Sequence, residues 1–138
     1  MQLVFKFKKE FIENRPILRP KIPIKFSRNG KSLLLVGLLD SGSDFIVVPK
    51  DVADYLELKY GKKEEESEGI GGTVKLRYSL ANISIDKYIF HNIPVHVLPE
   101  GSKLSGGIII GREPVFKEFD VEFRLNSNKI FLRRTKRG

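Results

Sequence analysis

Cysteine is absent from this chain of 138 residues, and so are long hydrophobic runs. The lack of cysteine excludes disulfides, thiolate chemistry and cysteine-ligated zinc. No apolar stretch approaches the ~20 residues that a membrane-spanning helix requires. Residues 1–14 alternate apolar side chains with lysine, without the continuous apolar core of a signal peptide. We therefore expect a soluble, cytoplasmic protein with no membrane partner.

The rest of the composition is typical of one folded domain. Hydrophobic residues make up 41% and charged residues 30% of the chain, which suits a soluble globular protein. The net charge is +8, with basic residues gathered over residues 15–31 and in the terminal run of residues 133–137. Such clusters can bind nucleic acid. We favour the simpler interpretation, a solvated strand face and a frayed tail, and expect no nucleic-acid partner.

The spacing of apolar residues predicts short strands joined by turns. Residues 2–8 and 22–26 alternate with period two, which indicates half-buried strands. The Asn29-Gly30 pair favours a tight hairpin turn, and the apolar run that follows, residues 32–40, is typical of a strand buried on both faces. Further strands are expected at residues 45–49, 73–85, 87–98 and 108–111, and a final hairpin is expected around residues 126–128.

Two short helices interrupt the strands. Residues 51–58 have helical spacing with Asp51 as a candidate cap, and a second helix is expected to begin at Arg112. The charged residues 61–72 are interpreted as an exposed connection. The predicted fold class is mostly β, a small closed β-barrel or folded sheet with one or two short helices. We expect one domain over residues 1–138, with a front extension (1–20) and a C-terminal hairpin strand and basic tail (126–138).

Asp40 is the most conspicuous of the six aspartates, because it ends the apolar run and is followed at once by Ser-Gly-Ser. A carboxylate at the end of a buried strand is unfavourable unless it accepts hydrogen bonds. The backbone N–H of Gly42 and the hydroxyl of Ser43 are close enough in sequence to donate them. The alternative is an ordinary turn, since Asp, Ser and Gly are common turn residues.

Three motifs in order resemble the retroviral aspartic protease (retropepsin) family. Residues 38–49, LLDSGSDFIVVP, resemble its active-site segment. Residues 69–72, GIGG, resemble the glycine-rich tip of its flap, and residues 109–112, IIGR, resemble the segment before its short helix. Each motif is weak alone, but their order and spacing over about residues 20–125 make the resemblance specific. It implies the half-domain fold of the acid proteases.

The resemblance implies roles for the matched positions. Asp40 corresponds to the catalytic carboxylate, in a catalytic triplet with Ser41 and Gly42, and Arg112 corresponds to an arginine that pairs with Asp44. We expect that ion pair to be partly buried. The substrate-contacting positions implied are Leu38, Ser43, Asp44, Val47, Gly69, Ile70, Gly71, Gly72 and Ile109. From the residues themselves, we expect the Ser43 hydroxyl to donate to Asp40, which would move activity to acidic pH.

One Asp-Ser-Gly triplet implies two chains. Peptide hydrolysis by this chemistry needs two carboxylates that share a proton, one as acid and one as base. A symmetric homodimer is the simplest source of the second carboxylate. The hypothesis is therefore a homodimeric aspartic endopeptidase that cleaves extended apolar segments of peptide or protein substrates. The front extension and the final hairpin depart from the retroviral pattern, so we expect the dimer contacts to be built differently.

Other readings have less support. His91 and His96 are five residues apart on a strand and would face opposite sides, which is unfavourable for a shared metal ion. We expect no metal and no cofactor. Two alternatives stay open: a non-catalytic retropepsin-like module for dimerisation or peptide binding, and a basic β-barrel that binds nucleic acid.

Overall fold

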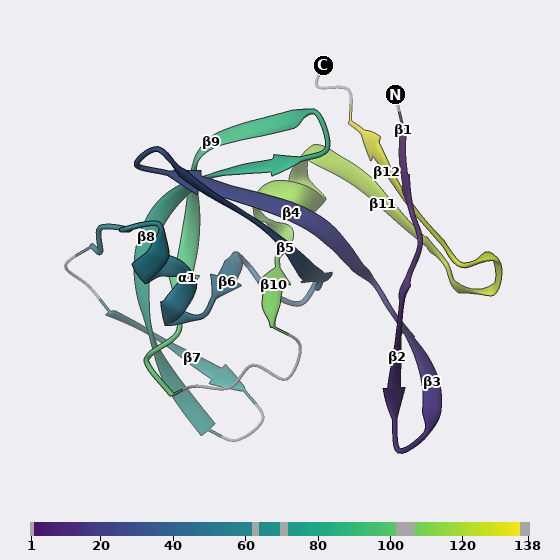
Figure 1. The fold of residues 1–138 in the computed structure, drawn as a ribbon, viewed down its shortest axis with the longest axis horizontal. Coiled ribbons are helices and arrows are strands. Elements are labelled where there is room, and N and C mark those ends of the chain that lie inside the picture. The colour runs from purple at the N-terminus through teal and green to yellow at the C-terminus, as the bar shows by residue number, and fades with distance from the viewer. Residues whose placement is uncertain (1, 62–63, 70–71, 102–106, 136–138) are drawn as a thin grey trace.

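The computed structural model describes residues 2–61, 64–69, 72–101 and 107–135 (Figure 1). Its largest sheet has the strand order β4-β5-β10-β6-β9-β8-β7. Pairing of β4 with β8 closes the first six of these strands into a barrel, which confirms the predicted fold class. The strands are β4 (Lys21–Arg28), β5 (Lys31–Leu39), β6 (Ile46–Val48), β7 (Glu64–Gly69), β8 (Gly72–Ile85), β9 (Tyr88–Val97) and β10 (Ile108–Ile110).

Alternation along β4 builds one wall of the barrel core. Ile22, Ile24 and Phe26 are buried, while the residues between them face outward. The Asn29-Gly30 turn joins β4 to β5 as predicted, with positive φ at both residues. The expectation that β5 is buried on both faces is wrong, because Leu34 is 72% exposed. As a strand of the barrel wall, β5 has only one face toward the core.

A second, three-stranded sheet has the order β1-β12-β11 and unites the two ends of the chain (Figure 1). Its strands are β1 (Gln2–Phe5), β11 (Phe119–Arg124) and β12 (Lys129–Arg134). A short 3-10 turn, η2 (Leu125–Ser127), and Asn128 in the left-handed region connect β11 to β12. The predicted final hairpin is thus confirmed.

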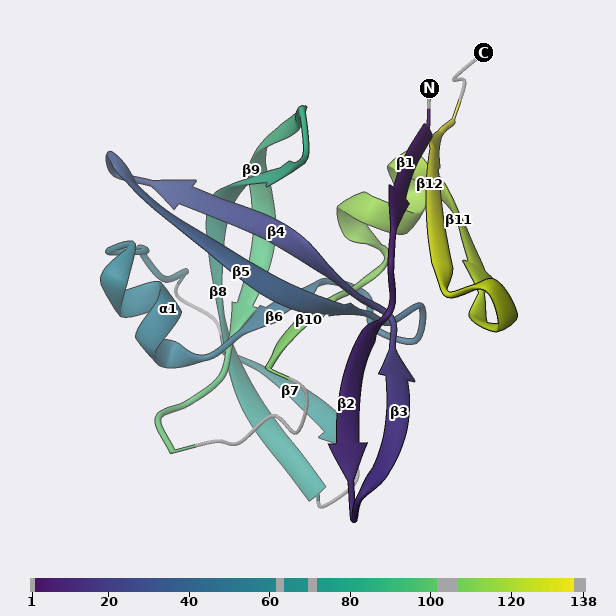
Figure 2. The same cartoon turned by 45° about the vertical axis from the view of Figure 1, so that its right-hand side comes forward.

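The front extension forms more than the single strand expected over residues 2–8. After β1 ends at Phe5, a separate hairpin follows, made of β2 (Lys8–Ile12) and β3 (Arg15–Arg19). We call residues 8–19 the arm. The arm is a two-stranded sheet of its own that projects away from the barrel in both views (Figures 1 and 2).

The helical segments are short. α1 spans Lys50–Tyr55, but Pro49 occupies its N-cap position and no side chain caps it, so the expectation that Asp51 caps this helix is wrong. η1 spans Arg112–Phe116, where the second helix was expected to begin. Within the described residues, no helix is long and apolar enough to cross a membrane.

The acidic segment expected to be an open connection is instead the strand β7. It pairs with β8 in a hairpin whose register sets Glu64 opposite Arg77 and Glu66 opposite Lys75. Backbone pairing with β8 therefore overrides the low strand propensity of glutamate in this segment.

Candidate active site

The backbone positions Asp40 at the point where β5 leaves the barrel wall. β10 runs parallel to β5, and the Asp40 N–H donates to the Ile110 carbonyl oxygen at 2.9 Å. On the other side, the Leu39 N–H donates to the Pro20 carbonyl oxygen, also at 2.9 Å. Hydrogen bonds on both sides hold the strand end, so the loop of residues 40–44 starts from a defined position.

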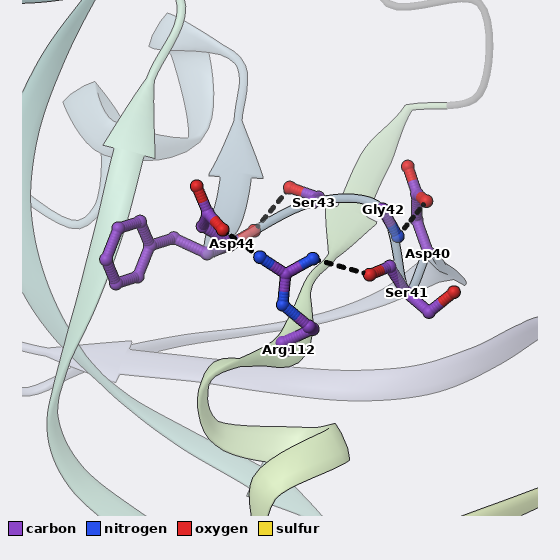
Figure 3. Close-up of polar contacts among 7 residues, drawn as sticks. Asp40, Ser41, Gly42, Ser43, Asp44 and Arg112 are labelled. Atoms are coloured by element: carbon purple, nitrogen blue, oxygen red, sulfur yellow. Dashed lines mark hydrogen bonds and ion pairs between the residues drawn. The ribbon is translucent and has the colours of Figure 1, made fainter.

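The Asp40 carboxylate is oriented by its own loop (Figure 3). The Gly42 N–H donates to Asp40 Oδ1 at 2.9 Å, and the Ser43 N–H donates to the Asp40 carbonyl oxygen at 3.2 Å. A Cβ at position 42 would lie 3.2 Å from the same Oδ1, so glycine lets the backbone approach the carboxylate closely. The predicted support from Gly42 is confirmed.

The expected hydrogen bond from Ser43 to Asp40 is wrong. The Ser43 hydroxyl donates to the Phe45 carbonyl oxygen at 2.9 Å, two residues further along the loop (Figure 3). Ser43 therefore stabilises the turn into β6, and the argument that this hydroxyl moves activity to acidic pH no longer holds.

Arg112 clamps the loop from the side of η1. Its Nη1 donates to the Ser41 carbonyl oxygen at 2.7 Å, and its Nη2 donates to Asp44 Oδ1, which is the ion pair predicted from the motif (Figure 3). Two backbone hydrogen bonds, from residues 112 and 113 to the carbonyl oxygens of residues 43 and 44, run alongside. The two side chains are 50% and 71% exposed in the single chain, so the expected partial burial is wrong. Exposed pairs of this kind contribute about 0–1 kcal/mol.

Gly111 is a site residue that the motif contained but that received no role. A Cβ at this position would lie 2.3 Å from the Phe45 carbonyl oxygen and 2.6 Å from the Ser43 carbonyl oxygen. The backbone just after β10 thus passes directly against the backbone of residues 43–45. A glycine just before the clamping arginine was the available signal.

A row of half-buried side chains crosses the sheet next to the loop. The register pairs Leu38 with Ile109 and Ile109 with Val47, so the three predicted pocket residues are neighbours on one face. The row continues from Val47 to His96 on β9, whose ring meets the Phe45 ring edge-on at 4.8 Å. Sequence reasoning missed Phe45 and His96, because the strand order that joins β6 to β9 is not encoded in any local pattern.

The site geometry agrees with a family match. A family model described as aspartyl protease matches residues 22–113, which include the Asp40 loop and Arg112. The chain belongs to this aspartyl protease family. Among solved structures, the chain is similar to the crystal structure of a retropepsin-like aspartic protease from Rickettsia conorii. That similarity has a TM-score of 0.58 and 15% identity over 96% of this chain and 89% of the other, which establishes a shared fold. No curated protein matches the chain.

The glycine-rich segment of the chain joins β7 to β8. Gly69 and Gly72 face each other as the last pair of that hairpin. Ile70 and Gly71, the expected tip of the flap, lie outside the described residues. In the part of the chain that the structure describes, no group of three or more His, Asp or Glu side chains is placed to hold a metal ion.

Proposed function

We propose that this chain is one half of a homodimeric aspartic endopeptidase. The observation that supports this best is the Asp40 loop: a carboxylate at a strand end, oriented by Gly42, in a loop clamped by Arg112. The other acidic residue of the loop, Asp44, is engaged by Arg112. The partner carboxylate is therefore proposed to come from Asp40 of a second copy.

The proposed chemistry uses the two Asp40 carboxylates as one unit. Carboxylates about 3 Å apart cannot both ionise, so one keeps a proton and the other is charged. The charged carboxylate takes a proton from a water molecule held between the pair, and the water oxygen attacks the peptide carbonyl carbon. The protonated carboxyl group donates its proton to the carbonyl oxygen. The carboxyl group that took the proton from water then gives it to the amide nitrogen as the carbon–nitrogen bond breaks, and a hydroxyl of the tetrahedral intermediate returns a proton to the other carboxylate.

The proposed substrate is an extended peptide that lies across the catalytic loops. Leu38, Val47 and Ile109 form an apolar surface beside Asp40, which suits apolar side chains on either side of the cleaved bond. The β7–β8 hairpin is proposed to close over the peptide as a flap through residues 69–72. Exclusion of water by such a flap strengthens the electrostatic interactions inside the site.

The nucleic-acid alternative finds less support in how the basic residues are used. Arg133 pairs with Glu122 through a 2.8 Å contact, and Arg134 lies between 5.3 and 5.8 Å from the ring centroids of Tyr88, Phe90 and Phe119. Both guanidinium groups are therefore engaged by other side chains of the same chain, which leaves them less available to contact a phosphate backbone.

The catalytic proposal is tested by Asp40→Asn. This change keeps the size of the side chain and removes the carboxylate, so we expect cleavage of an apolar peptide to fall below detection. Asp51→Asn, on the exposed first turn of α1, is the matched control and should cleave like the parent. Retained cleavage by Asp40→Asn would exclude the aspartic mechanism.

Mixing tests the requirement for two copies. When excess Asp40→Asn chain is equilibrated with the parent, most parent chains enter mixed dimers that contain a single Asp40. We expect the activity of the parent to fall as the excess rises. An excess of a chain that carries Asp40→Asn together with a change that prevents dimerisation should leave the activity of the parent unaltered. Activity that is independent of added Asp40→Asn chain would contradict the homodimer.

A further inference from the structure

One face of the arm continues the side-chain alternation of the segments on either side of it. In β4 the core-facing positions are Ile22, Ile24 and Phe26, and the same alternation followed back past Pro20 into β3 reaches Leu18 and Pro16. Before the arm, residues 3, 5 and 7 are buried or half-buried, and the same alternation followed into β2 reaches Lys9 and Phe11. The register pairs Lys9 with Leu18 and Phe11 with Pro16, so both rows meet on one face of the arm.

This face loses its cover toward the tip of the arm. Leu18 packs on the hydrophobic core, but Phe11 is 67% exposed and Pro16 opposite it is also exposed. The Phe11 ring makes a cation–π contact with Lys9 of the same strand, whose ammonium nitrogen lies 5.6 Å from the ring centroid. An isolated two-stranded hairpin is marginally stable in water. We therefore infer that another molecule covers this exposed apolar face of the arm.

The base of the arm lies next to the catalytic carboxylate. Pro20, the residue after β3, accepts the hydrogen bond from the Leu39 N–H at 2.9 Å, and Leu39 directly precedes Asp40. Lys21 at the start of β4 is in register with Leu38 near the end of β5. In an aspartic dyad the second Asp40 is about 3 Å away. The chain that supplies it must approach the side of the molecule from which the arm projects.

The catalytic loops alone are too small to hold two copies together. A stable interface buries about 800 Å² on each partner, far more than the five residues 40–44 expose. The first strand is engaged within its own chain, because β1 pairs with β12 from Gln2–Arg133 to Phe5–Ile130. Two described segments beside Asp40 present exposed apolar side chains: the arm, with Phe11 67% exposed, and the outer face of β5, with Leu34 72% exposed. The arm is the one of the two that stands out from the barrel, where a second copy can be reached (Figures 1 and 2).

We propose that the arm is a dimerisation arm that docks on a second copy of this chain, with Phe11 and Pro16 at the contact. The inference rests on the proposed homodimer and adds the surface that holds it together. Two-fold symmetry makes the contact occur twice, once from each arm.

Sedimentation equilibrium on the full chain measures the dimer dissociation constant. Burial of a phenylalanine side chain favours association by at least ~10-fold, so two symmetric contacts predict that Phe11→Ser raises the dissociation constant by about 100-fold. Ile89→Ser is the matched control, because Ile89 is 60% exposed on β9, and it should leave the constant unchanged. A peptide assay should show that Phe11→Ser regains parental turnover at high protein concentration.

A second readout does not depend on the Phe11 variant folding. Since the chain has no cysteine, Pro16→Cys places a single thiol on the proposed contact face. We expect alkylation of this thiol to slow by about an order of magnitude as the protein concentration rises from below to above the dimer dissociation constant. Arg15→Cys carries its thiol on the opposite face of the arm and should react at the monomer rate throughout.

The outcomes separate the arm from the catalytic proposal. A parent that dimerises and cleaves while Phe11→Ser dimerises equally well, or while the Pro16→Cys thiol stays reactive, overturns the arm and leaves the homodimer standing. Equal weakening by Phe11→Ser and Ile89→Ser overturns the arm as well. A parent that remains monomeric overturns both proposals. A thiol that is protected at every concentration shows that the arm folds on its own chain, which also overturns the inference.

Discussion

At the scale of single residues, Gly111 sets how closely the end of β10 approaches the Asp40 loop. Its backbone is extended, with φ −87°, a conformation open to any residue. Glycine is therefore required here for steric reasons and not for its backbone freedom, because a Cβ would clash with the carbonyl oxygens of Ser43 and Phe45. The atoms that it would meet belong to backbone and cannot rotate away.

We predict that Gly111→Ala lowers turnover by about 100-fold, since a displacement of about 1 Å at a catalytic group can cost that much. It should also lower the free energy of unfolding by about 1–3 kcal/mol, the usual range for overpacking. Steady-state kinetics and urea denaturation measure the two effects. Gly61→Ala, whose Cβ would meet a Tyr78 ring carbon at 3.4 Å, is the matched control. Normal turnover in Gly111→Ala would show that the loop tolerates the shift.

At the scale of elements, a charged contact tethers the arm to the barrel. Glu10 on β2 accepts a 2.7 Å hydrogen bond from Lys21 Nζ at the start of β4. This hydrogen bond, assisted by the charges of Lys21, Lys8 and Arg19, lowers the pKa of Glu10 below 4.5. A pKa lowered by folding means that the contact stabilises the arm fully above pH 4.5. That stabilisation is lost as the pH falls through the lowered pKa.

We predict that the arm loosens at pH values below 4.5 in the parent chain. Protonation of Glu10 removes the charge that holds Lys21, so hydrogen-exchange protection factors in β2 and β3 should fall relative to those of β12. Glu10→Gln should show the loosened arm already at pH 7, with little further change in acid. Glu122→Gln, in the terminal sheet, should retain the parental pH dependence of the arm. An arm equally protected at both pH values would contradict the tether.

At the scale of the whole molecule, the proposed site is divided between two copies. Each Asp40 loop ends one barrel, and neither barrel holds two such loops. We predict that specific activity falls on dilution below the dimer dissociation constant and recovers on concentration. Initial rates of peptide cleavage over a dilution series measure this, with the dimer fraction followed by sedimentation. Specific activity that stays constant while the dimer fraction falls would mean that one chain suffices.

Much of the fold and the centre of the site could be predicted from the sequence, because they depend on local patterns. Period-two alternation in residues 22–26 follows from the geometry of a strand with one face in a core. The Asn29-Gly30 turn follows from the positive φ angles that a tight hairpin requires. The order of the three motifs identified Asp40, Gly42 and Arg112 together, since each motif is contiguous in the chain.

Only the tertiary structure decided which atoms those residues meet. The Ser43 hydroxyl donates to the Phe45 carbonyl oxygen and not to Asp40, because the turn into β6 places the two groups within hydrogen-bond distance. The exposed face of β5 and the strand pairing of the glutamate-rich β7 depend on neighbours distant in sequence. The same holds for the arm: alternation predicts strands at the front of the chain, but only packing shows where their apolar rows run past the core. Burial and strand pairing each depend on two segments that meet in the fold. A local sequence pattern describes only one of those segments.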